Sequence, residues 1–210
     1  MGGAGRCRCP GEPGMSRPLF NQYLLKRIMP KNFMRGLLCL CWLYLIGLPA
    51  LAQSDENLEL LRAVHRADLP AIEKLLNEGA DVNARQSDGK TALLTAVRRN
   101  ELEVVRLLLD HGADVNVQDQ RDISALMQAV AGRQKEIAEL LLERQAQVNA
   151  QDYKGRTPLM LSVGPETELM TALIAKGAAL DAADIVGNTA LMRAANAGQL
   201  QALEVLLDAD

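Results

Sequence analysis

Proton transfer near neutral pH is the chemistry that a histidine side chain serves best, and beyond residue 52 the sequence has two histidines, His65 and His111. Neither has a serine or an acidic residue at a spacing that suggests a Ser-His-Asp arrangement. His111 directly precedes Gly112, at the expected end of a helix, where a polar side chain is solvated. We therefore interpret both histidines as structural or surface residues and predict that the chain is not an enzyme. A hydrolase with an unrecognised site is an alternative.

Metal-binding chemistry has one superficial candidate, the acid-rich stretch DHGADVNVQDQRD at residues 110–122. A calcium loop needs a central glycine for its sharp turn and a closing glutamate as a bidentate ligand, and this stretch has neither. Thiolate chemistry is restricted as well, because the cysteines all lie in the first 52 residues. They are Cys7, Cys9, Cys39 and Cys41. We therefore predict no catalytic residue, no metal site and no cofactor.

The first 52 residues form a segment of a different kind. They contain seven Lys or Arg against one acidic residue, and the 12-residue apolar run LLCLCWLYLIGL at 37–48 precedes PALAQ. A basic start, a short apolar core and small residues at Ala50 and Ala52 predict a secretory signal peptide, cleaved between Ala52 and Gln53. The alternative is an uncleaved N-terminal membrane anchor, although a spanning helix needs about 20 apolar residues.

The basic part of this segment is long for a signal peptide, and a chain started at Met29 or Met34 would carry a shorter one. We expect an exported protein, in the periplasm of a Gram-negative bacterium. Residues 53–210 then hold 16 Lys or Arg and 25 Asp or Glu, a formal net charge of −9. This acidic balance argues against nucleic acid as a partner, and against an anionic membrane once the signal peptide is removed.

The rest of the sequence repeats itself every 33 residues. The stretch GADVNARQSDGKTALLTA at 79–96 returns as GADVNVQDQRDISALMQA from Gly112. A fixed period of this size is typical of a stacked repeat protein. The copies predict repeats at 53–85, 86–118, 119–151, 152–183 and 184–210. The fourth copy is one residue shorter, and we place the loss at Gly164-Pro165.

Each copy predicts two helices and an extended finger. In the second copy, Thr91 precedes ALLTAVRR as a helix-capping hydroxyl. The run LEVVRLLL at 102–109 then places its apolar residues on one face at helical spacing, and Gly112 supplies the left-handed residue that ends the second helix. The following polar residues are expected to form the finger, with Asp88-Gly89 in one copy and Lys154-Gly155 in another making the turn at its tip.

This pattern resembles the ankyrin repeat over residues 53–210. The resemblance rests on TALL, SALM, TPLM and TALM, together with GADVN, GADVN, QAQVN and GAALD, repeated in register. It implies an all-α repeat solenoid of about five helix-turn-helix repeats with β-hairpin fingers, and a scaffold that binds proteins. Two departures stand out. Met or Leu occupies the position of the family's usual histidine, at Leu94, Met127, Met160 and Met192. Gln145 replaces the usual glycine in the third copy.

In ankyrin-like stacks, the finger tips and the exposed ends of the first helices line one concave face. By register, the candidate partner-binding residues are His65, Arg66, Arg98 and Arg99 at helix ends, and Lys90, Arg121, Ile123, Tyr153, Lys154, Arg156, Ile185 and Val186 on fingers. The set is locally basic, which predicts a partner protein with an acidic patch. An aromatic residue beside Arg and aliphatic residues also has the composition of an interface hot spot.

Two further interpretations concern partners. The chain is alternatively an accessory factor that supports, or delivers a ligand or cofactor to, a periplasmic enzyme. In addition, the fifth copy keeps internal-type apolar residues where a terminal repeat normally turns a polar face outward. These are Leu191, Leu200, Leu203 and Leu206. We therefore expect weak self-association, or a second partner site, at the C-terminal end of the stack.

Overall fold

The computed structural model describes residues 55–86 and 88–209, which all belong to the compact unit Pro49–Asp210. The predicted signal segment, its cleavage point and its alternative starts lie outside the described residues. Residues 55–66 form the first described helix. The named helices that follow are α3 (Leu69–Asn77), α4 (Ala92–Arg98), α5 (Leu102–Asp110), α6 (Ala125–Ala131), α7 (Lys135–Glu143), α8 (Pro158–Ser162), α9 (Glu168–Ala175), α10 (Ala190–Asn196) and α11 (Leu200–Asp208).

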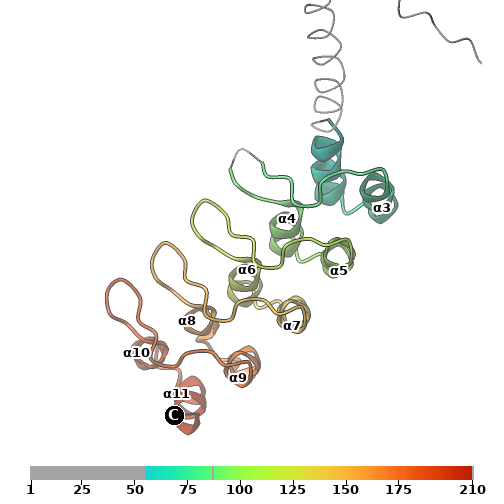
Figure 1. The fold of residues 1–210 in the computed structure, drawn as a ribbon. Coiled ribbons are helices and arrows are strands. Elements are labelled where there is room, and N and C mark those ends of the chain that lie inside the picture. The colour runs from blue at the N-terminus through green and yellow to red at the C-terminus, as the bar shows by residue number, and fades with distance from the viewer. Residues whose placement is uncertain (1–54, 87, 210) are drawn as a thin grey trace, which may run out of the picture. The chain divides into compact units, whose positions relative to one another are not determined.

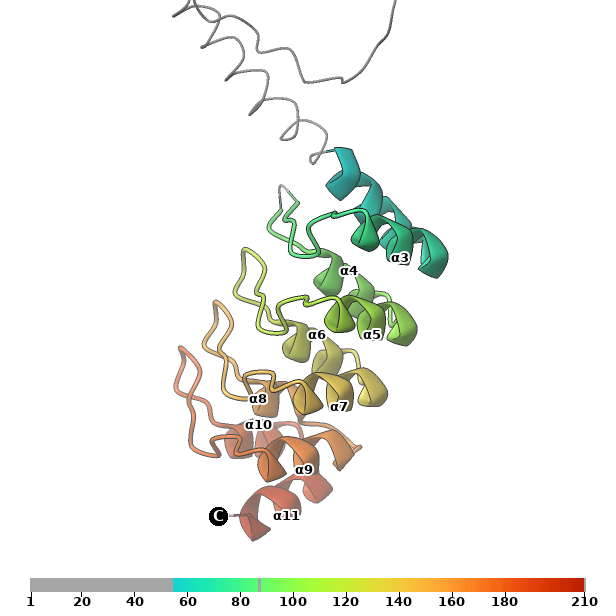
Figure 2. The ribbon, with the colours of Figure 1, turned by 45° about the vertical axis from the view of Figure 1, so that its right-hand side comes forward.

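The helices are arranged as a stack of pairs. In each pair the two helices pack on one another, and each also packs on its counterpart in the next pair, as α4 does on α6 and α5 on α7. Figure 1 shows α4, α6, α8 and α10 as an inner row and α3, α5, α7 and α9 as an outer row, with looped fingers projecting beyond the inner row. Figure 2 shows the same succession of pairs from a second direction. The structure is thus the helical repeat solenoid that the sequence predicts.

A hydroxyl begins each inner helix from α4 onward. The Thr91 side chain accepts a hydrogen bond from the Leu94 amide at 3.4 Å, and Ser124 accepts one from the Met127 amide at 3.2 Å. Thr157 and Thr189 cap α8 and α10 in the same way. Each hydroxyl satisfies an amide that the first helical turn leaves without an intrahelical partner. The predicted capping role is confirmed.

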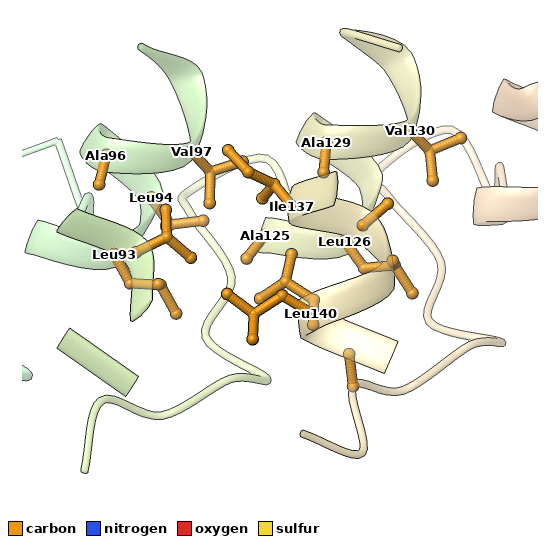
Figure 3. Packing of buried hydrophobic residues seen from close by; sticks show 14 of the residues in the cluster. Leu93, Leu94, Ala96, Val97, Ala125, Leu126, Ala129, Val130, Ile137 and Leu140 are labelled. Atoms are coloured by element: carbon orange, nitrogen blue, oxygen red, sulfur yellow. The ribbon is translucent and has the colours of Figure 1, made fainter. Parts of the chain in front are cut away.

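The core lies between successive pairs, where the apolar faces of the helices meet. In Figure 3, Leu94 and Val97 extend from α4 toward the next pair, where Ala125 and Ile137 lie. All four of these residues are fully buried. At the position of the family's usual histidine, Met127 and Met160 are also at most 1% exposed. Apolar packing of Leu94, Met127 and Met160 therefore occupies that position as expected, whereas Met192 of the last copy is 51% exposed.

Left-handed backbone ends the outer helices. Gly112 has φ of +83°, and Gln145 has φ of +63° at the matching position of the third copy. The finger after α7 therefore leaves its helix in the same way as its neighbours, even though a side chain in this conformation costs about 1–2 kcal/mol. Glycine was the residue expected here, and Gln145 reproduces its geometry.

The shortened fourth copy has a shorter inner helix. The helix α8 is Pro158–Ser162, and its C-cap Val163 leaves the helical conformation at φ −55°, ψ 119°. Arg133 of the preceding pair reaches into the resulting space, where its Nη2 donates to the Val163 carbonyl at 3.3 Å. A Cβ on Gly164 would lie 1.8 Å from that nitrogen, so a larger residue there would displace the Arg133 guanidinium. The structure thus accommodates the missing residue at the predicted turn.

The fingers differ from the expected β-hairpins. Within the described residues there is no strand, and one isolated antiparallel bridge pairs Gln118 with Ser124. Within a finger, a backbone hydrogen bond closes the tip, as from the Asp119 amide to the Ile123 carbonyl and from the Asp152 amide to the Arg156 carbonyl, both at 3.1 Å, but the pairing does not extend into strands. Side chains also link the starts of successive fingers: Asn83 accepts from the Asp114 amide and Asn116 from the Gln147 amide, both at 2.8 Å. No described helix has the length and apolar character needed to cross a membrane.

Candidate functional site

A buried carboxylate fixes the tip of each later finger. Asp152 accepts the backbone amides of Lys154 and Arg156 on Oδ1, both at 2.9 Å. Asp119 does the same for the second finger and Asp184 for the fourth. The carboxylate therefore holds the backbone of the turn, while the side chains that follow it are free to point outward. This local geometry positions most of the finger residues predicted to bind a partner.

Electrostatics stabilise the ionised form of this carboxylate. Arg156 contacts Asp152 Oδ2 through Nε at 2.8 Å and through Nη2 at 2.6 Å. Burial raises the pKa of Asp152, but hydrogen bonds from the Arg156 side chain and from the backbone amides outweigh burial and lower the pKa below its usual value. Arg156 is consequently bound to the finger itself, and its guanidinium is a structural group as well as part of the surface.

Backbone hydrogen bonds join neighbouring fingers at their tips. The Tyr153 amide donates to the Arg121 carbonyl at 3.1 Å, and the Ile185 amide donates to the Lys154 carbonyl at 3.0 Å. Gly155 allows the second approach, because a Cβ there would lie 3.0 Å from the Ile185 nitrogen. The three fingers are thereby held in register, and their tip side chains form one continuous surface.

We call Tyr153, Lys154, Ile185 and Val186 the finger-tip surface. Tyr153 is 50% exposed, and Ile185 and Val186 are 74% and 78% exposed. The Lys154 ammonium lies 5.3 Å from the centroid of the Tyr153 ring, within the range of a cation–π interaction. Apolar side chains of this exposure contribute little to the core of the stack. They are available to a partner.

A second feature, the central groove, lies between the finger bases and the inner helices α4, α6 and α8. Its volume is about 480 Å³. Five of the predicted partner-binding residues line it: Lys90, Arg98, Arg121, Ile123 and Arg156. Lys90 pairs with Asp88, and Arg156 pairs with Asp152. Within residues 55–86 and 88–209, the guanidinium groups of Arg98 and Arg121 have neither an ion pair nor a hydrogen bond, so they are the cations open to a ligand.

The remaining predicted residues lie elsewhere. His65 and Arg66 line a separate N-terminal groove of about 860 Å³, together with Leu58 and Leu61 of the same helix. Arg99 lies 3.8 Å from Glu101 in an ion pair and lines neither groove. Apart from Arg99, the predicted set is therefore divided among the finger-tip surface, the central groove and the N-terminal groove.

Sequence reasoning missed two residues of the central groove. Gln128 on α6 and Gln134 in the following turn both line it, and the Oε1 atom of each is buried without a hydrogen-bond partner. Their neighbours Ala131 and Gly132 occupy the positions where α4 has Arg98 and Arg99. That change from large to small side chains at matching positions was the available signal, because it predicts a hollow at the end of α6.

The described side chains offer no obvious catalytic arrangement. His65 and His111 are both exposed and belong to different pairs of helices. In the described ranges, no group of three or more His, Cys, Asp or Glu side chains is placed to hold a metal ion. What the surface provides is exposed apolar and cationic side chains on a backbone held by hydrogen bonds.

Comparison with known families agrees with the arrangement of the helices. A family model described as ankyrin repeats (3 copies) matches residues 60–152 and 148–210. No match to the chain is found among curated proteins. The two matched ranges together run through every helix from α3 to α11. The chain therefore belongs to the ankyrin repeat family.

Proposed function

We propose that the chain is a non-catalytic scaffold that binds another protein through the finger-tip surface and the central groove. Ankyrin repeats generally mediate protein–protein interaction. The observation that carries the proposal for this surface is the exposure of Tyr153, Ile185 and Val186 on fingers whose backbones are bonded together. Rigid presentation of exposed apolar side chains reduces the entropy lost on binding.

The composition of this surface supports a protein partner. Tyrosine and arginine are enriched among the residues that dominate binding energy at interfaces, and they act best when water is excluded around them. Tyr153 and Ile185 lie on neighbouring finger tips, because the Ile185 amide donates a hydrogen bond to the carbonyl of Lys154, the residue after Tyr153. An apolar partner side chain seated here would be surrounded by Lys154 and Arg121, which supply the polar rim.

Charge supports a partner with an acidic patch. The central groove is lined by four cationic side chains and two acidic ones, and both acids, Asp119 and Asp152, are buried and bonded within their fingers. The chain beyond residue 52 is acidic overall, so this face is locally opposite in sign to the rest. Such a patch steers an acidic partner and disfavours a basic one.

Export and a periplasmic location form part of the proposal, and the sequence of residues 1–52 is what supports them. The basic start, short apolar core and Ala50-Leu51-Ala52 favour cleavage before Gln53 over an N-terminal anchor. The intact mass of the native protein distinguishes the two. We expect a chain that starts at Gln53, whereas retention of residues 37–52 in a membrane fraction would mean an anchored protein.

One observation favours the alternative role, an accessory factor that delivers a ligand or cofactor to an enzyme. The N-terminal groove has about 860 Å³ and combines Leu58 and Leu61 with His65 and Arg62. A concave site with apolar walls and a few polar groups is the usual form of a small-molecule site. Equilibrium dialysis of the chain against a cofactor panel tests this role, and binding that His65→Ala removes would support it.

The C-terminal end of the stack is the proposed surface for self-association. Leu206 is 4% exposed and packs on the preceding pair, but Leu200 and Leu207 on the same helix are 73% and 61% exposed. Met192 on α10 is 51% exposed, whereas its buried counterparts Met127 and Met160 are covered by the next pair. The exposed side chains form the kind of face that a second copy could cover.

A paired substitution tests the main proposal. We expect Tyr153→Ala combined with Arg121→Glu to abolish capture of the partner from a periplasmic extract, measured by quantitative mass spectrometry, without changing helical content or melting temperature. Arg156 is left unchanged, because reversing its charge would place a carboxylate against Asp152. The matched control is Arg106→Glu on the outer helix α5, which is exposed and lines neither groove. Loss of capture by the control alone would refute the proposal.

A further inference from the structure

The central groove lies where two large side chains of one repeat are replaced by small ones in the next. The inner helix α4 ends in Arg98 and is followed by Arg99, whereas α6 ends in Ala131 and is followed by Gly132. Both small residues line the groove. A Cβ on Gly132 would lie 3.2 Å from the Gln128 carbonyl oxygen and 3.2 Å from Gln134 Nε2. The hollow therefore depends on small residues at this end of α6.

Two hydrogen-bond acceptors without partners in the described part of the chain lie directly behind the lining of the groove. Gln128 and Gln134 both line it, and the Oε1 atoms of both are buried without a partner in the described residues. A buried acceptor without a partner is unfavourable, and native proteins pair nearly all such groups. A glutamine amide carries both a donor and an acceptor, as does a peptide unit. Because these oxygens have almost no accessible surface, a ligand with a backbone would give them partners once the two side-chain amides turn toward the hollow.

The groove also presents two cations without partners. Arg98 and Arg121 line it from α4 and from the second finger, and neither guanidinium is bonded to a described residue. A guanidinium binds a carboxylate through two parallel hydrogen bonds, which makes it specific for planar acids. Apolar contacts are available close by from Ile123 and Leu161, which are both partly exposed.

We propose that the central groove binds an extended peptide segment of the partner that carries one Asp or Glu side chain. The carboxylate lies between Arg98 and Arg121, and the side-chain amides of Gln128 and Gln134 turn toward the adjacent backbone of the segment and pair with it. This inference rests on the proposed function and adds to it the chemistry of the recognised segment. The volume of about 480 Å³ is in the range of sites that hold ligands much larger than a single carboxylate, roughly 300–1,000 Å³.

A selected peptide tests the proposal. Nine-residue peptides, acetylated and amidated at their ends, would be selected from a random library on the full chain, and the tightest would be remade with each Asp or Glu changed to Asn or Gln. We expect an acidic residue at one fixed position, and at least tenfold weaker binding when it is neutralised, by fluorescence anisotropy. The difference should shrink as salt is raised, because a partly exposed charge pair is screened.

Variants of the chain locate the site. Arg98→Gln and Arg121→Gln should each weaken binding of the acidic peptide several-fold and leave binding of the neutralised peptide unchanged. Ala131→Trp should weaken binding of both peptides, because the large side chain fills the hollow. The substitution is at an exposed position and alters no charge. If Ala131→Trp lowers the melting temperature, Gln134→Ala takes its place. Arg106→Gln is the matched control. Free glutarate at millimolar concentration should not displace the peptide.

The results that would contradict this inference differ from those that would contradict the proposed function. Selection of no peptide, of peptides without a fixed acid, or of peptides unaffected by both Ala131→Trp and Gln134→Ala would overturn this inference. Displacement by glutarate would also overturn it, in favour of a small-acid site. In all of these cases the proposed function stands if Tyr153→Ala with Arg121→Glu still abolishes partner capture, and it fails with the inference if that capture persists.

Discussion

At the scale of single residues, the carboxylates at the finger tips have two functions. Asp152 bonds two backbone amides and also pairs with Arg156, whereas Asp184 bonds its amides and lies 3.8 Å from Arg193. The hydrogen bonds to backbone amides fix the shape of the turn, and the contact with an arginine fixes where a cation lies on the surface. The exposed side chains of the fingers can therefore differ from copy to copy without changing the backbone that presents them.

The lowered pKa of Asp152 makes part of the stability dependent on pH. A carboxylate whose pKa is lower in the folded state contributes stability above its usual pKa of 3.8, and this contribution is lost as pH falls through the folded value. We predict that Asp152→Asn lowers the melting temperature at pH 7 and that the difference from the natural chain diminishes below about pH 4. Differential scanning calorimetry between pH 3 and 7 measures it.

The matched control for this prediction is Asp181→Asn. Asp181 is exposed and makes no hydrogen bond or ion pair within the described residues. Its effect at pH 7 should be small, since isolated surface substitutions usually change stability little. An equal effect of the two substitutions at pH 7, or a difference for Asp152→Asn that grows in acid, would show that the Arg156 pair does not stabilise the finger.

Sequence reasoning located the finger residues but not their separate environments. The period placed Lys90, Arg121 and Arg156 at the fingers, and the structure brings all three to the central groove. It could not show that Arg156 is bound to Asp152, because this pair depends on the turn of the finger. Gln128 and Gln134 were missed because a polar residue within a helix or turn gives no sign of being buried.

At the scale of the elements, the stability that each helix contributes depends on the pair of helices that covers it. Leu126 on α6 is 1% exposed, whereas Leu191, at the same position of α10, is 37% exposed. The helices themselves are short, so their stability comes from packing more than from intrinsic propensity. Repeat proteins of this kind are stabilised by contacts between nearest neighbours. A residue in an interior repeat should therefore contribute more to stability than the residue at the matching position of the terminal repeat.

We predict that Leu126→Ala lowers the free energy of unfolding by about 2–5 kcal/mol, since a fully buried leucine leaves a cavity when it is truncated. The same change at Leu191 should cost less than about 1.5 kcal/mol, because part of that side chain is already in water. Urea denaturation followed by circular dichroism measures both. Equal losses at the two positions would contradict the claim that the following pair covers Leu126 and leaves Leu191 open.

The elements were largely predictable, with one exception. The capping residues Thr91 and Ser124 begin their helices, and the shortened turn lies at Gly164, because these features are determined by local chemistry. The hairpin pairing was the exception. The turn at the finger tip follows from local chemistry, and its backbone bond is present, but how far the pairing extends beyond the tip does not follow from the turn residues.

At the scale of the whole molecule, the last described pair of helices has an apolar face that no further described pair covers. At the C-terminal end, Leu200 and Leu207 are exposed on one helix. We predict a weak monomer–dimer equilibrium of the natural chain in sedimentation velocity, and a monomer at every concentration for Leu200→Glu. A charged residue on an apolar face opposes association because it would be desolvated in the dimer.

The control for this prediction is Glu204→Gln, on the same helix, which should leave the equilibrium unchanged. Leu203 is less suitable for substitution than the sequence suggested, because it packs partly on the core and its loss would also affect folding. Identical sedimentation of the natural chain and Leu200→Glu, with no dependence on concentration, would exclude self-association through this end.

The central claim is that a partner protein binds where the fingers and the central groove lie, and site-specific photo-crosslinking tests it most directly. A photoreactive benzoylphenylalanine would replace Tyr153 at the finger tip in one chain and Arg106 on the outer helix α5 in another. On irradiation of living cells, we predict a covalent adduct of higher mass from position 153 and none from position 106. An adduct from position 106, with none from position 153, would contradict the claim and assign binding to the outer row of helices.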